Sequence, residues 1–153
     1  MSNSASAVRT IDDPPHRVDG VGTLLRQLVV VTDAESVVVC GNAPAAVPLA
    51  EALREYGRGQ VVAWAGEEGR DGRPVLPGPV DLVVLVGDPE RFLALLRAME
   101  PRLLPGAVVV ACGGAGAAER AADFLAHVRA PGSGYVSQPL ALDDGVEMAV
   151  RSA

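Results

Sequence analysis

Four stretches with glycine, acidic or cysteine residues each follow a short apolar run of this sequence. They are Gly41 to Pro44, Ala65 to Glu68, Gly87-Asp88 and Cys112 to Gly116. Glycine lets a backbone approach a ligand closely, and a carboxylate accepts hydrogen bonds from hydroxyl groups. If the apolar runs are parallel strands, the four stretches lie together beyond their carboxyl ends, where open α/β sheets bind ligands. The sequence therefore predicts a binding site at that edge.

The elements that must hold these stretches alternate in type along the chain. β-Branched runs predict buried strands, and apolar residues at helical spacing predict helices. Strands are expected over Ser36–Cys40, Gln60–Trp64, Asp81–Val86 and Ala107–Ala111, the last after a turn at Pro105-Gly106. Helices are expected over Gly20–Val31, Pro44–Tyr56, Asp88 to about Glu100, and the alanine-rich segment after Gly116.

The end of the chain predicts a hairpin. Tyr135 to Leu142 and Val146 to Arg151 alternate in hydropathy around Asp143-Asp144-Gly145, and Asp-Gly is a strong hairpin signal. The whole order predicts an α/β, Rossmann-like fold: a mostly parallel sheet with helices on both faces and a C-terminal antiparallel β-hairpin. A chain of 153 residues can bury one core, so we expect a single domain over 18–153. Residues 1–17 are polar and predict a flexible N-terminal arm.

Composition excludes several classes of function. The net charge of -6 argues against nucleic acid or an anionic membrane as the main partner. No apolar run is long enough for a membrane helix, and the start has no signal-peptide pattern, so a cytoplasmic protein is expected. All thirteen basic residues are arginine, which excludes a P-loop lysine and a Schiff-base lysine.

The two cysteines end strands that we expect to be neighbours. Cys40 and Cys112 would then lie near each other at the carboxyl edge, either as a thiol pair or as two small buried apolar side chains. No lysine or histidine lies nearby in the sequence to lower a thiol pKa. The pattern favours buried cysteines.

Residues 20–41, GVGTLLRQLVVVTDAESVVVCG, resemble the lead-in helix and first strand of small bacterial class I S-adenosylmethionine-dependent O-methyltransferases of the catechol and caffeoyl-CoA type. The segment DLVVLVGDPERFLALLRAMEPRLLPGAVVVACGG resembles that family's fourth strand, helix and fifth strand, and PLALDDGVEMAVR resembles its closing hairpin. The resemblance implies a reduced class I methyltransferase fold. It also implies that S-adenosylmethionine is the cofactor to test.

The cofactor motifs depart from the family's pattern. The family's Glu-x-Gly-x-x-x-Gly motif, whose carboxylate helps hold the cofactor, is here Val39-Cys40-Gly41-Asn42-Ala43-Pro44-Ala45. The family's ribose-binding acid aligns with Ala65, so Glu67 or Glu68 would have to replace it. By resemblance, the cofactor-binding candidates are Gly41, Asn42, Glu67 and Asp88; no catalytic residue is identified.

Two further departures concern the metal site and the middle of the fold. The family's metal ligands align with Val86, Cys112 and Gly113, so the resemblance implies no metal. Between its second and fourth strands the family carries a helix, a strand and a helix, which close the adenine side of the pocket. The seventeen residues from Ala65 to Asp81 are too few for all three, because one crossover takes a dozen or more.

Each candidate site also has a structural interpretation. Gly41 to Ala45 fits a tight strand-to-helix turn, Glu67 and Glu68 fit solvated loop charges, and Asp88 fits a helix cap. Trp64 fits the core or an interface better than a ligand contact. His127 falls late in a helix, where we expect it to face solvent or the helix dipole.

Three hypotheses about function follow. The first is an O-methyltransferase-like protein that is catalytically degenerate and acts as a dimerising scaffold or a partner subunit. The second is a minimal S-adenosylmethionine-dependent O-methyltransferase acting on a small molecule. The third is a small-molecule binding module. The first implies a homodimer or a partner methyltransferase subunit, with the apolar helix face from Leu24 to Val31 as the interface.

Overall fold

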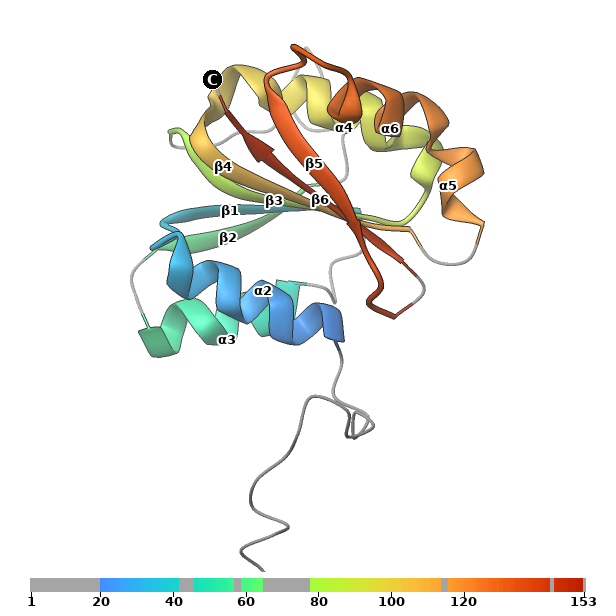
Figure 1. Ribbon diagram of the computed structural model, residues 1–153. Coiled ribbons are helices and arrows are strands. Elements are labelled where there is room, and N and C mark those ends of the chain that lie inside the picture. The colour runs from blue at the N-terminus through green and yellow to red at the C-terminus, as the bar shows by residue number, and fades with distance from the viewer. Residues whose placement is uncertain are drawn as a thin grey trace, which may run out of the picture.

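Six strands form one sheet in the computed structural model (Figure 1). They are β1 (Ser36–Cys40), β2 (Gln60–Trp64), β3 (Val80–Val86), β4 (Leu103–Cys112), β5 (Tyr135–Leu140) and β6 (Val146–Arg151). Their order across the sheet is β2-β1-β3-β4-β6-β5. The structure describes residues 20–41, 46–56, 59–64, 78–113, 116–143 and 145–152.

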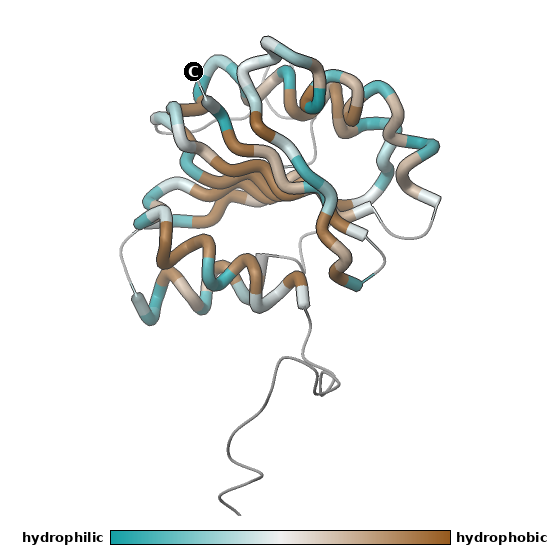
Figure 2. Tube along the Cα trace, in the orientation of Figure 1, coloured by the Kyte–Doolittle hydropathy of each residue, from teal (hydrophilic) through white to brown (hydrophobic). Residues whose placement is uncertain are grey.

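The strand directions confirm the predicted sheet. β2, β1, β3 and β4 are parallel, whereas β6 runs antiparallel to both β4 and β5. In β1 and β3 nearly every residue is buried, because helices cover both faces of the parallel part. Figure 2 shows these central strands as the most hydrophobic part of the chain.

Helices form a layer on each face of the sheet (Figure 1). On one face lie α2 (Gly20–Val31) and α3 (Ala46–Tyr56); on the other lie α4 (Phe92–Met99), α5 (Ala117–Arg120) and α6 (Ala122–Arg129). Short 3-10 turns, η2 (Pro89–Arg91) and η3 (Glu100–Arg102), flank α4. None of the helices in the described part of the chain has the length and hydropathy to span a bilayer.

Alternate residues of the central strands supply two separate apolar cores. Val37 and Val39 of β1 pack with α2 and α3, whereas Val38 and Cys40 pack in the core under α4 and α6. This division follows from the strand period of two, which sends successive side chains to opposite faces.

The turn predicted at Pro105-Gly106 is a bulge inside β4. Val80 of β3 pairs with Leu103, but Leu82 pairs with Val108, so β4 has extra residues between these pairs. Proline has no N–H to donate to the ladder, and Gly106 has a φ of +89°, so neither suits regular pairing. The strand consequently starts earlier than predicted.

Other element bounds agree closely with the sequence prediction. The helix at Gly20–Val31 and the strands Ser36–Cys40, Gln60–Trp64 and Val146–Arg151 are confirmed to the residue. The predicted helix after Asp88 is present as η2, α4 and η3. The predicted arm, 1–17, lies outside the described residues, and the domain bounds remain a prediction.

Candidate functional site

Gly41 occupies a backbone position that no other residue type fits. Its φ is +113°, and a Cβ atom there would lie 1.8 Å from the carbonyl oxygen of Val86 in β3. Its N–H donates a 3.1 Å hydrogen bond to the carbonyl of Trp64. The contacts on both sides come from the chain itself, so they support the interpretation of this segment as a tight turn.

Asp88 caps the helical segment that follows β3. Its Oδ1 accepts a 3.1 Å hydrogen bond from the backbone N–H of Glu90 and a 2.6 Å bond from Nη2 of Arg120 on α5. These two bonds tie the start of η2 to α5. The structure thus gives Asp88 a local structural role, and its contact with a cofactor remains a prediction.

The two cysteines are not neighbours, so the expectation of a nearby pair is wrong. β3 lies between β1 and β4, and it separates Cys40 from Cys112. The two thiols also face different layers, because Cys40 packs in the α4 and α6 core and Cys112 packs against the other core. Burial raises the pKa of the Cys40 thiol to about 12, although the charge of Arg91 opposes the shift.

Trp64 is a core residue, as the sequence predicts. Its side chain is 2% exposed and belongs to the α4 and α6 core. No described residue accepts a hydrogen bond from its indole N–H.

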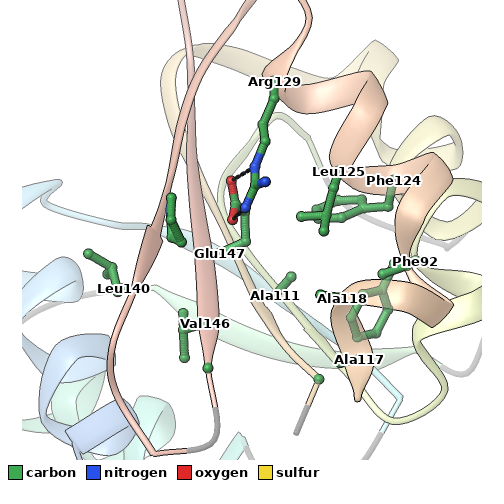
Figure 3. Close-up of a pocket in the computed structure, with 14 residues that line it drawn as sticks. Phe92, Ala111, Ala117, Ala118, Phe124, Leu125, Arg129, Leu140, Val146 and Glu147 are labelled. Carbon is green, nitrogen blue, oxygen red and sulfur yellow. Dashed lines mark hydrogen bonds and ion pairs between the residues drawn. The ribbon is translucent and has the colours of Figure 1, made fainter. Parts of the chain in front are cut away.

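A pocket of about 160 Å³ opens between α5, α6 and the strands β4 and β6. Its walls are mainly small or aromatic and include Ala111, Ala118, Phe92, Phe124 and Leu125. Figure 3 shows the phenylalanines and Leu125 on the helix side. Of the predicted cofactor residues that the structure describes, neither Gly41 nor Asp88 lines this pocket.

One wall of the pocket carries an ion pair between a buried glutamate and a partly exposed arginine. Glu147 of β6 is 6% exposed, and its carboxylate accepts hydrogen bonds from Arg129 Nε at 2.9 Å and Arg129 Nη2 at 2.5 Å. Ser137 Oγ donates a third bond at 2.7 Å. Burial alone would raise the pKa of Glu147, but the bonds from Arg129 and Ser137 outweigh burial and hold this pKa below its usual value. The carboxylate therefore stays ionised inside the fold.

Solved structures of methyltransferases share this architecture. The O-methyltransferase TomG from Streptomyces achromogenes, involved in tomaymycin synthesis and solved with S-adenosylmethionine, is 16% identical, with a TM-score of 0.64 over 87% of this chain and 80% of that chain. An O-methyltransferase from Bacillus cereus, solved with S-adenosylhomocysteine, is 15% identical, with a TM-score of 0.61 over 98% and 87%. A methyltransferase from Podospora anserina, also solved with S-adenosylhomocysteine, is 11% identical, with a TM-score of 0.57 over 87% of this chain and 78% of that chain.

The chain has the fold of an O-methyltransferase. At these identities the likeness establishes the fold alone. The sequence matches no protein-family model and no curated protein.

The described part of the carboxyl edge departs in two places from the pattern of the family that the sequence resembles. Val39, at the position of the glutamate in the family that the sequence resembles, is fully buried in the core with α2 and α3. The space beside Gly41 is filled by the chain's own Val86 carbonyl. Within the described ranges, no three side chains of His, Cys, Asp or Glu are grouped to hold a metal ion. Asn42 and Glu67 lie outside the described residues.

The outer edge of the methyltransferase sheet also differs from the family's pattern. β2 ends the sheet on its side, and no described strand pairs beyond it. In the family that the sequence resembles, a third strand adds to this edge and helps close the adenine side of the pocket. That wall has no counterpart among the strands that the structure places.

A second polar cluster lies near the start of β4, at the end of the parallel strands of this methyltransferase fold that is opposite to their carboxyl ends. Glu100 Oε2 is 2.8 Å from His127 Nε2, and it accepts a 2.8 Å hydrogen bond from the Tyr135 hydroxyl. The guanidinium of Arg151 lies 3.8 Å from the same oxygen and 4.8 Å from the Tyr135 ring centre. His127 lies in the last turn of α6, as expected for a residue that favours the helix dipole, and its side chain, 25% exposed, also has a carboxylate partner.

Sequence reasoning missed both polar clusters for one reason. Glu147 and Arg151 alternate with apolar residues of β6, a pattern that normally marks a solvent-facing side. In this fold α6 covers that side, and its residues Arg129 and His127 supply the partners. The sequence offers one signal for these contacts: polar residues on the last strand, Glu147 and Arg151, together with basic residues late in α6, His127 and Arg129.

We predict that acid weakens the fold through Glu100. Burial would raise the pKa of this carboxyl, but bonds from His127 and Tyr135 and the charges of His127 and Arg151 outweigh burial and lower it. A lowered pKa in the folded state stabilises the protein above the unfolded pKa, near 4.5, and this stabilisation is lost as the pH falls further. Urea unfolding from pH 6 to pH 3 should show the loss, and Glu100→Gln should flatten the profile. Glu119→Gln on the exposed face of α5 is the control, and an unchanged slope in Glu100→Gln would contradict the prediction.

Proposed function

We propose that this chain is an O-methyltransferase-like protein that has lost catalysis and acts as a dimerising scaffold or as a partner subunit of an active methyltransferase. The observation that carries the proposal is the burial of Val39 where the family that the sequence resembles has its cofactor-holding glutamate. An apolar side chain with no exposed surface cannot accept a hydrogen bond from a cofactor. The sheet and its helices remain as a scaffold.

The first test is the thermal unfolding of the full chain with millimolar S-adenosylmethionine or S-adenosylhomocysteine. A ligand at about 100 times its dissociation constant stabilises the folded state by about 2.7 kcal/mol, which is worth several degrees in Tm for a domain of this size. We expect no shift with either ligand. A clear shift with either one would overturn the proposal.

The alternative function is a minimal S-adenosylmethionine-dependent O-methyltransferase. It is favoured by the complexes of TomG with S-adenosylmethionine and of the Bacillus cereus enzyme with S-adenosylhomocysteine. In that case transfer would rest on positioning, with Glu67 in place of the missing acid. Glu67→Gln should then weaken cofactor binding at least tenfold in calorimetry, and an unchanged affinity would remove Glu67 from the site.

The scaffold proposal needs an interface, and α2 offers one. Leu25, Leu28 and Val29 are buried against the sheet, whereas Val30 and Val31 are 52% and 80% exposed. A groove formed by α2 and Tyr56 at the end of α3 lies beside them. Apolar surface of this kind is suited to a second copy of the chain or to a related subunit.

We predict that Val31→Asp shifts the chain from dimer to monomer. A buried, unpaired carboxylate in an apolar interface weakens association strongly because the charge loses its hydration. Light scattering at micromolar concentration measures the change, and Val136→Asp is the control, since Val136 is 70% exposed on β5, away from α2. A wild-type monomer at this concentration would contradict the α2 interface.

We also propose a cytoplasmic location. The proposal rests on cysteine usage, because two cysteines in 153 residues form no disulfide framework of the kind common in small secreted domains.

A further inference from the structure

We propose that the pocket between α5, α6, β4 and β6 binds a small neutral aromatic amide. This site goes beyond the proposed scaffold function and does not depend on it. It also differs from the predicted cofactor position, because Gly41 and Asp88 are absent from its walls. The proposal rests on the size of the pocket, its apolar walls and the ion pair at one side.

The size of the pocket and its apolar walls suit a ligand with a single aromatic ring. A dry apolar cavity of about 150 Å³ in a protein core is large enough for benzene. This pocket has a volume of about 160 Å³, and Phe92, Phe124 and Leu125 supply its apolar wall on the helix side. Phe92 and Phe124 are themselves packed edge to face, with ring centres 5.8 Å apart, which fixes their positions. A flat ring can be sandwiched between this wall and the strands without displacing charged groups.

The ion pair selects a neutral partner over a charged one. Arg129 and Glu147 neutralise each other through two hydrogen bonds, so the pocket wall has no net charge to attract an ion. A carboxylate ligand would be repelled by Glu147, and an ammonium ligand would be repelled by Arg129. Either ion would also lose its hydration in an apolar pocket.

The hydrogen-bonding capacity that remains on the pair matches an amide. Glu147 Oε2 accepts hydrogen bonds from Arg129 Nε and Ser137 Oγ, whereas Arg129 Nη2 is the one donor to Oε1 among the described residues. A carboxylate oxygen has room for a second donor, and Nη1 of Arg129 makes no hydrogen bond to Glu147. Figure 3 shows this guanidinium alongside the carboxylate at one end of the pocket. A carboxamide presents an N–H for Oε1 and a carbonyl oxygen for Nη1 side by side.

Four single-ring probes separate the possibilities. Benzamide, benzoate, benzylamine and toluene are titrated into the ¹⁵N-labelled full chain, and shifts of backbone amide signals from α5, α6 and β6 report binding. We expect benzamide to bind about tenfold more tightly than each of the other three, which corresponds to one lost or opposed polar contact of about 1.4 kcal/mol. Equal binding of all four probes, or no binding of millimolar benzamide, would overturn the proposal.

Two variants locate the site. Ala118 lines the pocket but is itself exposed on α5, so Ala118→Leu should fill the space and weaken benzamide binding at least tenfold without unfolding the chain. Ala122→Leu, at an exposed position of α6 that does not line the pocket, should leave binding unchanged. Benzamide binding that survives Ala118→Leu would overturn the assignment to this pocket.

A charge variant tests the role of the ion pair. Glu147→Gln removes the negative charge and leaves Arg129 as a net positive group, so the preference should change from benzamide to benzoate. An unchanged preference in folded Glu147→Gln would show that the ion pair does not select the ligand. If this variant does not fold, Ala118→Leu and its control still decide the proposal. The result is independent of the S-adenosylmethionine test, because neither Gly41 nor Asp88 lines this pocket.

Discussion

Replacing Arg129 with methionine is expected to lower the free energy of unfolding by about 3 kcal/mol. Among the described residues, the substitution leaves the Glu147 carboxylate in the pocket wall with one partner, Ser137 Oγ at 2.7 Å. Removing one partner of a buried pair costs about 3–5 kcal/mol, because the remaining charge is uncompensated. The lower end applies here, since the Arg129 side chain is 45% exposed and water can partly replace it. Urea unfolding measures the difference.

The double variant Arg129→Met/Glu147→Met is the matched control for this prediction. A buried ion pair replaced by apolar side chains of similar volume is often as stable as the original pair, because neither charge loses its hydration. The double variant should therefore recover most of the stability lost in Arg129→Met. A double variant that is as unstable as the single one would show that Arg129 acts through its packing on α6 and not through its charge.

The sheet could be predicted from the sequence because its central strands are buried on both faces. Continuous β-branched runs such as Ser36–Cys40 have no other common explanation in a chain with frequent glycine and proline. The helix at Gly20–Val31 was equally clear, since its apolar residues repeat at helical spacing. The local hydropathy pattern therefore predicts an element wherever burial determines which of its residues are apolar.

Relations between distant strands could not be predicted from local pattern. The order of the strands decides that β3 separates Cys40 from Cys112, and no residue near either cysteine records that order. Partners for Glu147 and His127 likewise come from α6 and η3, which only the folded chain brings together. The candidate site was predicted least well for this reason: its polar groups depend on tertiary contacts.

The fold is shared with solved methyltransferases, but the described carboxyl edge departs from the pattern of the family that the sequence resembles. The parallel strands and their two helical layers keep the architecture seen in TomG, whereas the described carboxyl edge has an apolar Val39 and a closed turn at Gly41. The polar groups that remain organised, around Glu147 and Glu100, lie on the α4 and α6 side. The organised polar groups therefore lie on the side of one helical layer of the fold, and the two departures from the family's pattern, Val39 and the closed turn at Gly41, lie at the carboxyl end of β1.

Gly41→Ala is expected to destabilise the chain by at least about 3 kcal/mol or to prevent folding. An alanine at a φ of +113° is strained by about 1–2 kcal/mol. Its Cβ would also lie 1.8 Å from the Val86 carbonyl oxygen, so the backbone of β1 or β3 must move. Both strands lie in the centre of the sheet, where such a shift disturbs close packing on two faces. Thermal and urea unfolding provide the measurement.

Gly87→Ala separates the steric effect from the backbone strain. Gly87 also has a positive φ, +103°, but a Cβ atom there would meet nothing within 4 Å, so its cost should be limited to about 1–2 kcal/mol. The difference between the two variants then measures the contact of Gly41 with Val86. If Gly41→Ala were as stable as Gly87→Ala, the turn would have room beside β3, and a ligand approaching the Gly41 backbone would become the better explanation for the glycine.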